Sequence, residues 1–130
     1  MPFVRISLRR GKTKDYLAAL SASIHKAMTE SFEVPLDDLF HAIHQHDEHE
    51  LIFDRHYLGG PRTDDWVAIN IVAGRPRSAE AKRRFYKALV QCLKESPGIA
   101  PANVMVFINS TQPEEWSMAG GIAAVDIAPP

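Results

Sequence analysis

The sequence predicts a single α/β (α+β) domain in which two consecutive β-α-β units form a four-stranded sheet with two helices on one face. Short segments alternate apolar and polar residues, which is typical of strands with one buried face. Longer segments repeat apolar residues at steps of three and four, as amphipathic helices do. The order strand, helix, strand occurs twice. A chain of 130 residues is long enough for one domain over residues 1–130 and too short for two.

The first unit begins almost at the amino terminus. Residues 2–8 alternate apolar and polar side chains and predict a strand. Thr13 can cap a helix that ends before Pro35, because proline breaks the helical hydrogen-bond pattern. Residues 39–45 predict the second strand. The apolar stripe of the helix consists of Leu17, Leu20, Ile24, Ala27, Met28 and Phe32.

The second unit repeats this order after a Gly-Gly-Pro stretch at residues 59–61. Residues 66–73 are rich in β-branched and apolar side chains and predict a strand. Ser78 can cap a helix that the Pro-Gly pair at residues 97–98 ends, and residues 104–108 predict the last strand. The apolar stripe of this helix consists of Ala81, Phe85, Leu89, Cys92 and Leu93.

A sheet with helices on one side leaves its other face uncovered. Right-handed crossovers should place both helices on the same side, and residues 69–72 carry apolar side chains on both faces. With 45% hydrophobic residues in the chain, we expect another copy of the chain to cover the open face. Residues 110–130, which include Trp116 and Pro129-Pro130, predict an arm that either folds back or reaches a neighbouring copy.

The composition excludes several classes of function. The chain has 15 lysines and arginines against 16 aspartates and glutamates, so no global charge draws it to nucleic acid or to an anionic membrane. No apolar run approaches the roughly 18 residues of a membrane span, and no leader peptide is visible. Cys92 is the only cysteine, which excludes an internal disulfide and indicates a reducing compartment. We therefore expect a cytoplasmic protein.

Residues 74–78 (GRPRS) place two guanidinium groups at the start of the second helix. Cations at a helix amino terminus cost up to about 1 kcal/mol unless an anion lies among them. Backbone N–H groups together with Arg75 and Arg77 can converge on a carboxylate or phosphate. The alternative is that both arginines are solvated or pair with acidic neighbours such as Glu80. If they form an anion site, removing either arginine should cost little folding stability.

Pro2 becomes the amino terminus when Met1 is removed, and a small second residue favours that removal. The resulting secondary amine has a reference pKa of roughly 7.7 to 8.0. Nearby arginines or an apolar pocket favour the neutral amine, which is a base, whereas a neighbouring carboxylate favours the protonated amine. Many chains begin with Met-Pro for no catalytic reason, so this interpretation depends on other residues.

Two aspartates, Asp37 and Asp38, follow Pro35 and precede a predicted strand. One of them can project into a site while the other is an ordinary turn residue. The sequence favours the turn for at least one of the two.

Four clustered histidines invite a metal hypothesis. Two of them, His44 and His46, share one face of the predicted strand. This spacing supplies half a site, and no acidic or cysteine ligand stands in a recognised metal register. We therefore predict solvated or hydrogen-bonded histidines and no functional metal. The cluster consists of His41, His44, His46 and His49.

Short motifs follow one another in a specific order along nearly the whole chain. They are an initial Met-Pro, F-x-V-P with an aspartate soon after it (residues 32–38), Gln45-His46, R-P-R-S (residues 75–78) and E-W-S (residues 115–117). Together with the two β-α-β units, this order resembles the malonate semialdehyde decarboxylase branch of the tautomerase superfamily.

The resemblance implies the tautomerase fold, assembled as a homotrimer, and an enzyme whose central catalytic group is the amino-terminal Pro2. It implies that Arg75 and Arg77 bind and polarise the carboxylate and carbonyl of a small substrate. It also implies that Asp38 positions or activates a water molecule or a proton. No cofactor is implied.

Two further residues match positions that line the substrate pocket as an apolar wall in that family. They are Trp116 and Met118. The family carries an aromatic residue where this chain has Met118. This departure lies near the pocket mouth, so it bears on the identity of the substrate more than on the fold.

These features predict a metal-independent enzyme that decarboxylates a 3-oxo acid such as malonate semialdehyde. Cationic Pro2 and one arginine would stabilise the enolate while the other arginine holds the carboxylate. The alternatives are a keto-enol tautomerase, which needs neutral Pro2 as a base, and a hydratase of small unsaturated or 2-oxo acids. A pairing Asp38 favours the cation and hence decarboxylation. From another class, a ligand-binding trimer could keep the fold without turnover.

Overall fold

A mixed sheet of four strands forms the centre of the protein in the computed structural model, which describes residues 1–127. The spatial order of the strands is β2-β1-β3-β4. β1 pairs in parallel with β2, β3 pairs in parallel with β4, and the central strands β1 and β3 are antiparallel. The strands are β1 (Pro2–Arg9), β2 (His41–His46), β3 (Val67–Ala73) and β4 (Val104–Ser110).

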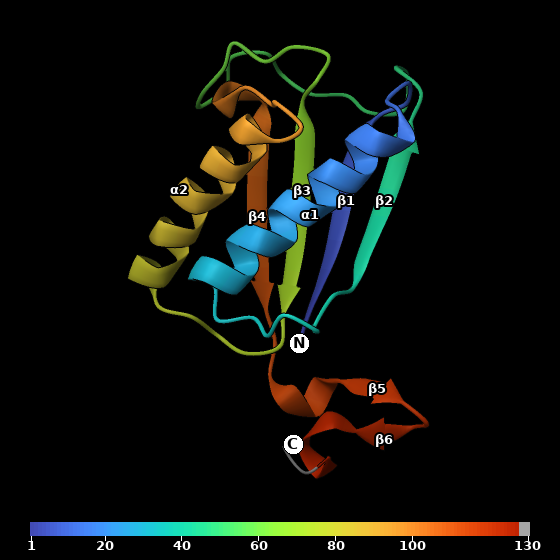
Figure 1. Cartoon of the computed structure of the whole chain (residues 1–130), viewed down its shortest axis with the longest axis vertical. Helices are drawn as coiled ribbons and strands as arrows, with labels where there is room; N and C mark the ends of the chain where they lie inside the picture. The colour runs from blue at the N-terminus through green and yellow to red at the C-terminus, as the bar shows by residue number, and fades with distance from the viewer. Residues whose placement is uncertain (128–130) are drawn as a thin grey trace.

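Two helices, α1 (Lys14–Ser31) and α2 (Ala79–Glu95), cover one face of this sheet (Figure 1). The inward side chains of β1 and β3 pack against the apolar stripes of both helices. Burying each large apolar side chain stabilises the fold by about 1.5–3 kcal/mol. The predicted arrangement of two β-α-β units with both helices on one face is confirmed. Fully buried core residues include Val4, Ile6, Ile24, Phe32, Ile69, Ile71, Phe85 and Leu89.

Both helices begin at the predicted caps. Thr13 Oγ1 accepts a hydrogen bond from Tyr16 N at 3.1 Å, and Ser78 Oγ accepts one from Ala81 N at 3.1 Å. Each cap satisfies an N–H group that has no partner within the first turn of a helix. The two helix starts could therefore be predicted from local sequence.

Two strands begin slightly later than predicted. β2 begins at His41 instead of residue 39, after a turn in which Asp38 N donates to Pro35 O at 3.1 Å. β3 begins at Val67, one residue later than predicted. Before β3, Trp66 N donates to Thr63 O at 3.1 Å, so a local turn takes up a backbone group that the alternating pattern had assigned to the sheet. Before β2, Phe40 O still accepts a hydrogen bond from Val4 N of β1 at 3.0 Å.

The sheet face opposite the helices is less apolar than the sequence suggested. Asn70 lies between the buried Ile69 and Ile71, and its side chain points to this open face. There its amide donates to Asn109 Oδ1 at 2.8 Å. The open face therefore mixes polar and apolar groups. Its larger apolar side chains are Phe3, Val72, Met105 and Phe107.

The chain beyond β4 forms an arm that projects past one end of the sheet (Figure 1). Two short antiparallel strands form a hairpin in this arm. The arm extends beyond its own sheet, and its contact with a neighbouring copy stays a prediction. The predicted Pro129-Pro130 end lies outside the described residues. The short elements are β5 (Ser117–Ala119), β6 (Ile122–Ala123) and the 3₁₀ turns Pro101–Asn103, Pro113–Glu115 and Ala124–Asp126.

Among residues 1–127, no helix combines the length and the apolar character that crossing a membrane requires. Within that same part of the chain, no three His, Cys, Asp or Glu residues come together as a metal site. His44 and His46 do share the open face of the sheet, beside Ser7 and Arg9. Independence from metal remains a prediction that activity in the presence of a chelator would test.

His41 is a group through which pH should alter folding stability. Burial, and secondly the proximity of His25, lower the pKa of His41 to about 4. Its Nδ1 lies 2.8 Å from Ser21 Oγ. An unfolded histidine has a pKa near 6.5, so the unfolded chain binds the additional proton between about pH 6.5 and pH 4. The free energy of unfolding should therefore decrease as the pH falls through this range, which thermal melts would measure.

Two variants isolate this contribution. His41→Asn keeps a polar group near Ser21 and should flatten the dependence of the melting temperature on pH. His49→Asn is the matched control, because the His49 side chain is 86% exposed and should contribute nothing. The same slope in wild type and His41→Asn would show that other groups cause the acid sensitivity.

Candidate active site

The predicted site residues come from segments that meet at one end of the sheet, where β1 begins and β3 ends. Pro2, the first residue of β1, pairs with Ala73, the last residue of β3. The segment that carries Arg75 and Arg77 therefore begins beside Pro2. The loop before β2 reaches the same end of the sheet because β1 and β2 are parallel. Figure 1 shows the amino terminus at this end, between the sheet and the arm.

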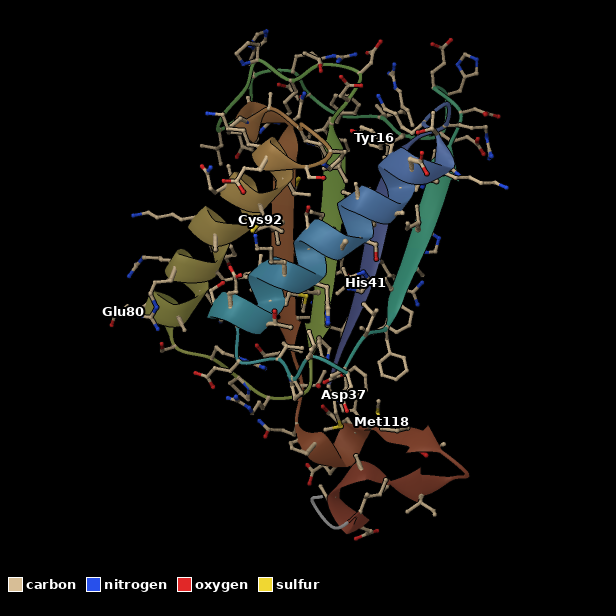
Figure 2. All side chains as sticks on the ribbon, viewed as in Figure 1. Tyr16, Asp37, His41, Glu80, Cys92 and Met118 are labelled. Carbon is tan, nitrogen blue, oxygen red and sulfur yellow. The ribbon has the colours of Figure 1, made fainter. Side chains whose placement is uncertain are left out.

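Asp38 faces the amino terminus of the chain. Its Oδ2 lies 2.8 Å from Met1 N, and its side chain is only 14% exposed. Asp37 is exposed and lies in the turn before β2 (Figure 2). Met1 is bonded directly to Pro2, so the nitrogen that Asp38 contacts is one residue away from the Pro2 nitrogen along the chain. The structure thus separates the two aspartates into a turn residue and a residue that meets the amino terminus.

Arg77 is held by backbone carbonyl groups and an aromatic ring. Its Nη1 donates to Arg75 O at 2.8 Å, and its Nη2 donates to Phe32 O at 3.0 Å. The guanidinium lies 4.4 Å from the centre of the Phe32 ring. Burial and then the charge of Arg75 lower the pKa of Arg77, while Asp38 acts in the opposite direction. Within residues 1–127 the buried Nε has no hydrogen-bond partner, so this fixed side chain retains a donor.

Arg75 forms an ion pair that the sequence did not predict. Its Nη2 lies 2.5 Å from Glu33 Oε2, and this hydrogen bond lowers the pKa of the Glu33 carboxyl. The two side chains are 49% and 64% exposed, so the pair contributes little to folding. Glu80, the partner considered from the sequence, instead pairs with Arg84 at 3.2 Å.

Trp116 is anchored to the end of β3 through Thr111. Its Nε1 donates to Thr111 Oγ1 at 2.6 Å, and that hydroxyl donates to Ala73 O at 2.7 Å. Because Ala73 pairs with Pro2, these bonds hold the base of the arm at the Pro2 end of the sheet. Met118 is half-buried in β5, and Figure 2 shows it on the side of the arm nearest the sheet.

Two known protein families match this chain. Residues 38–119 match a family described as tautomerase enzyme, and residues 2–59 match a second family of the same description. The chain belongs to the tautomerase family. The two matches together include the four strands of the sheet, both helices and β5, and so contain every segment of the site described above.

Relatives of this tautomerase extend over nearly its whole length. A Bacillus subtilis (strain 168) protein named probable tautomerase YusQ is 34% identical over 123 residues, which are 95% of this chain and 97% of the relative. A crystal structure of malonate semialdehyde decarboxylase, described as a basis for that enzyme's decarboxylase and hydratase activities, is 31% identical with a TM-score of 0.88 over 93% of each chain. A fused 4-OT wild-type symmetric trimer shares the fold, with 20% identity and a TM-score of 0.77 over 95% of this chain and 96% of that chain.

The candidate site has an amino terminus in contact with a carboxylate, and the segment that carries Arg75 and Arg77 begins beside them. The guanidinium groups can bind carboxylate or enolate oxygens through charge-assisted hydrogen bonds. An amine beside a carboxylate can hold a proton and deliver it. A groove of about 630 Å³ lies at the opposite end of β1, lined by residues that include Arg9 and Lys12, and so is separate from this site.

Sequence reasoning missed three contributors to the site. Phe32 was predicted as a core residue and as the start of the F-x-V-P motif, but not as a partner of Arg77, which both its ring and its carbonyl contact. Glu33 adopts a φ of 55°, a left-handed conformation that costs a non-glycine residue about 1 kcal/mol. Thr111 connects Trp116 to β3. Phe32 belongs to the helical stripe and both Phe32 and Glu33 to the F-x-V-P motif, but neither pattern predicts contacts with Arg77 and Arg75, because these partners lie far away in the sequence.

Proposed function

We propose that this tautomerase is an amino-terminal-proline enzyme that decarboxylates a 3-oxo acid such as malonate semialdehyde. The observation that carries the proposal is the contact of 2.8 Å between the amine of residue 1 and Asp38. Removal of Met1 would make Pro2 the terminal amine beside this carboxylate, which favours the protonated amine. The similarity to malonate semialdehyde decarboxylase, at 31% identity, supports the same class of substrate.

In the proposed reaction, one arginine holds the substrate carboxylate, while the other arginine and the Pro2 ammonium face the carbonyl oxygen. The bond between C2 and the carboxylate carbon breaks, and its electron pair enters an enolate that these cations stabilise. Carbon dioxide forms against the apolar wall of Trp116 and Met118. C2 then takes a proton from the Pro2 ammonium, or from water that Asp38 positions, and an aldehyde results. The carbonyl group itself accepts the electron pair, so the proposal needs no metal or cofactor.

A keto-enol tautomerase is the second candidate, because the matched families and YusQ carry that description. This reaction needs neutral Pro2, which takes a proton from the carbon beside the carbonyl and returns it elsewhere. A hydratase would use the same groups to direct water, as the description of the decarboxylase structure also suggests. The rate of decarboxylation should fall as the pH rises above the pKa of the amine, whereas the rate of tautomerisation should increase.

The test is a substrate panel assayed on protein whose intact mass shows that it begins at Pro2. Malonate semialdehyde should yield carbon dioxide and acetaldehyde in equal amounts, and a metal chelator should not reduce the rate. Exchange between keto and enol forms without carbon dioxide would favour the tautomerase. Saturable binding of these acids without any turnover would favour the ligand-binding trimer.

We also propose that the chain assembles as a homotrimer. Large apolar side chains are exposed on the open sheet face and on the arm, among them Phe107 at 45%, Ile122 at 53% and Val125 at 56%. Exposed large apolar side chains such as these are favourably buried at an interface, which supports the proposal. The fused 4-OT trimer, which shares the fold, supports three copies. Light scattering at micromolar concentration should give three times the mass of one chain.

A surface charge placed on the open face tests the interface. Phe107→Asp should shift the mass toward that of a single chain, because burying an unpaired carboxylate is costly. Lys87→Asp also introduces a carboxylate, but at an exposed position on α2, and should leave the trimer intact. A wild-type protein with the mass of one chain would contradict the trimer.

A further inference from the structure

Gly74 is required for space and not for backbone conformation. The chain has seven glycines, and the six others adopt a positive φ that favours glycine. Gly74 does not, yet a Cβ added to it would lie 2.8 Å from Met1 O and 2.9 Å from Met1 Cβ. A Cβ atom in a folded protein essentially never lies this close to another nonbonded heavy atom. A side chain at position 74 and residue 1 therefore compete for one volume.

That volume adjoins the reacting nitrogen of the proposed mechanism. Met1 O is bonded to the carbon that bonds Pro2 N, so a Cβ on Gly74 would lie within about 5 Å of that nitrogen. On its other side, Met1 reaches Asp38 through the amine contact of 2.8 Å. Met1 thus spans a gap between Gly74 and Asp38, and Gly74 itself is buried.

We propose that, in protein that begins at Pro2, this gap receives the substrate, and that Gly74 sets the size of substrate that fits. This inference rests on the amino-terminal-proline function proposed above. The Met1 atoms nearest Gly74 are the carbonyl oxygen and the side-chain carbons Cβ and Cε, and they stand in for the carbonyl and carbon atoms of a small oxo acid. The missing Cβ at Gly74 leaves room for a substituent on the carbon next to the substrate carbonyl.

A methyl group at position 74 would occupy the room for that substituent. Adding a carbon to a well-packed site changes affinity or rate by at least about tenfold. C2 of malonate semialdehyde carries only hydrogen atoms, so this substrate has no methyl group that could clash with the new side chain. A 3-oxo acid with a methyl group on C2 would place that methyl against the new side chain. Gly74 thus admits substrates branched at C2.

The test compares wild type and Gly74→Ala, both beginning at Pro2, on malonate semialdehyde and on its 2-methyl derivative. The substitution should lower kcat/KM for the methyl derivative at least about tenfold, and for malonate semialdehyde less than about threefold. The melting temperature should not fall, since φ at this position is ordinary. Equal losses on both substrates, or no loss on either, would overturn the inference.

Two controls keep this test independent of the proposed reaction. In protein made with methionine aminopeptidase inhibited, Gly74→Ala should melt below wild type, because its Cβ meets the retained Met1 backbone; equal melting would overturn the close approach. Calorimetry with the unreactive acids malonate and methylmalonate measures fit without turnover. If the wild-type protein binds both acids but decarboxylates neither semialdehyde, the proposed decarboxylase function is wrong. A loss of methylmalonate binding alone in Gly74→Ala would then still support Gly74 as the size filter.

Discussion

Protein that retains Met1 is expected to decarboxylate a 3-oxo acid at least about 100-fold more slowly than protein that begins at Pro2. In the retained form the Pro2 nitrogen is an amide, which neither accepts nor donates a proton at neutral pH. Met1 also fills the gap between Gly74 and Asp38. Values of kcat/KM for two preparations that differ by one methionine in intact mass would measure the effect.

Pro2→Ala separates the amine from the ring that carries it. The variant keeps a terminal amine after methionine removal but changes its basicity and rigidity, so kcat/KM should fall at least about tenfold. Thermal melts on the same samples establish that all forms are folded. Full activity in protein with Met1 attached would exclude every mechanism that runs through the Pro2 amine, while the fold and family would stand.

Arg75→Ala and Arg77→Ala should each lower kcat/KM for a carboxylated substrate at least about tenfold. Each guanidinium would form a charge-assisted pair with a carboxylate or enolate oxygen, worth roughly 1.5 to 3 kcal/mol. Their effects on folding should differ. Arg75 forms an exposed pair with Glu33, so the melting temperature should change little. Arg77 stacks on Phe32 and donates two hydrogen bonds, so its removal should lower the melting temperature.

This difference revises the expectation that removing either arginine would leave folding almost unchanged. Two variants serve as controls. Arg84→Ala also removes a positive charge from α2, where Arg84 pairs with Glu80, and should keep kcat/KM. Glu33→Gln breaks the ion pair and should match the melting temperature of Arg75→Ala. If Arg75→Ala melted far lower than Glu33→Gln while keeping kcat/KM, Arg75 would be a structural residue and not part of the site.

The elements of the fold could be predicted because their signals are local. Alternation in residues 2–8 and the caps at Thr13 and Ser78 involve neighbours within a few residues. The prediction for β3 was off by one residue because a local turn took up a backbone group, since Trp66 N donates to Thr63 O. The open face was predicted less well, because Asn70 lies within an apolar run and finds its partner on β4.

Local sequence was enough to define two β-α-β units, both helix caps and an unusual pair of arginines at a helix start. The contacts of the site depended on how the strands pair. Pro2 meets Ala73 through the register of β1 against β3, and this register brings Gly74 against residue 1. Arg75 finds Glu33 across 42 residues of sequence. No local period encodes which residues of distant strands lie opposite one another, since register follows from the burial of one whole face of the sheet. The composition of the site could therefore be proposed from motifs, but its geometry follows from tertiary packing.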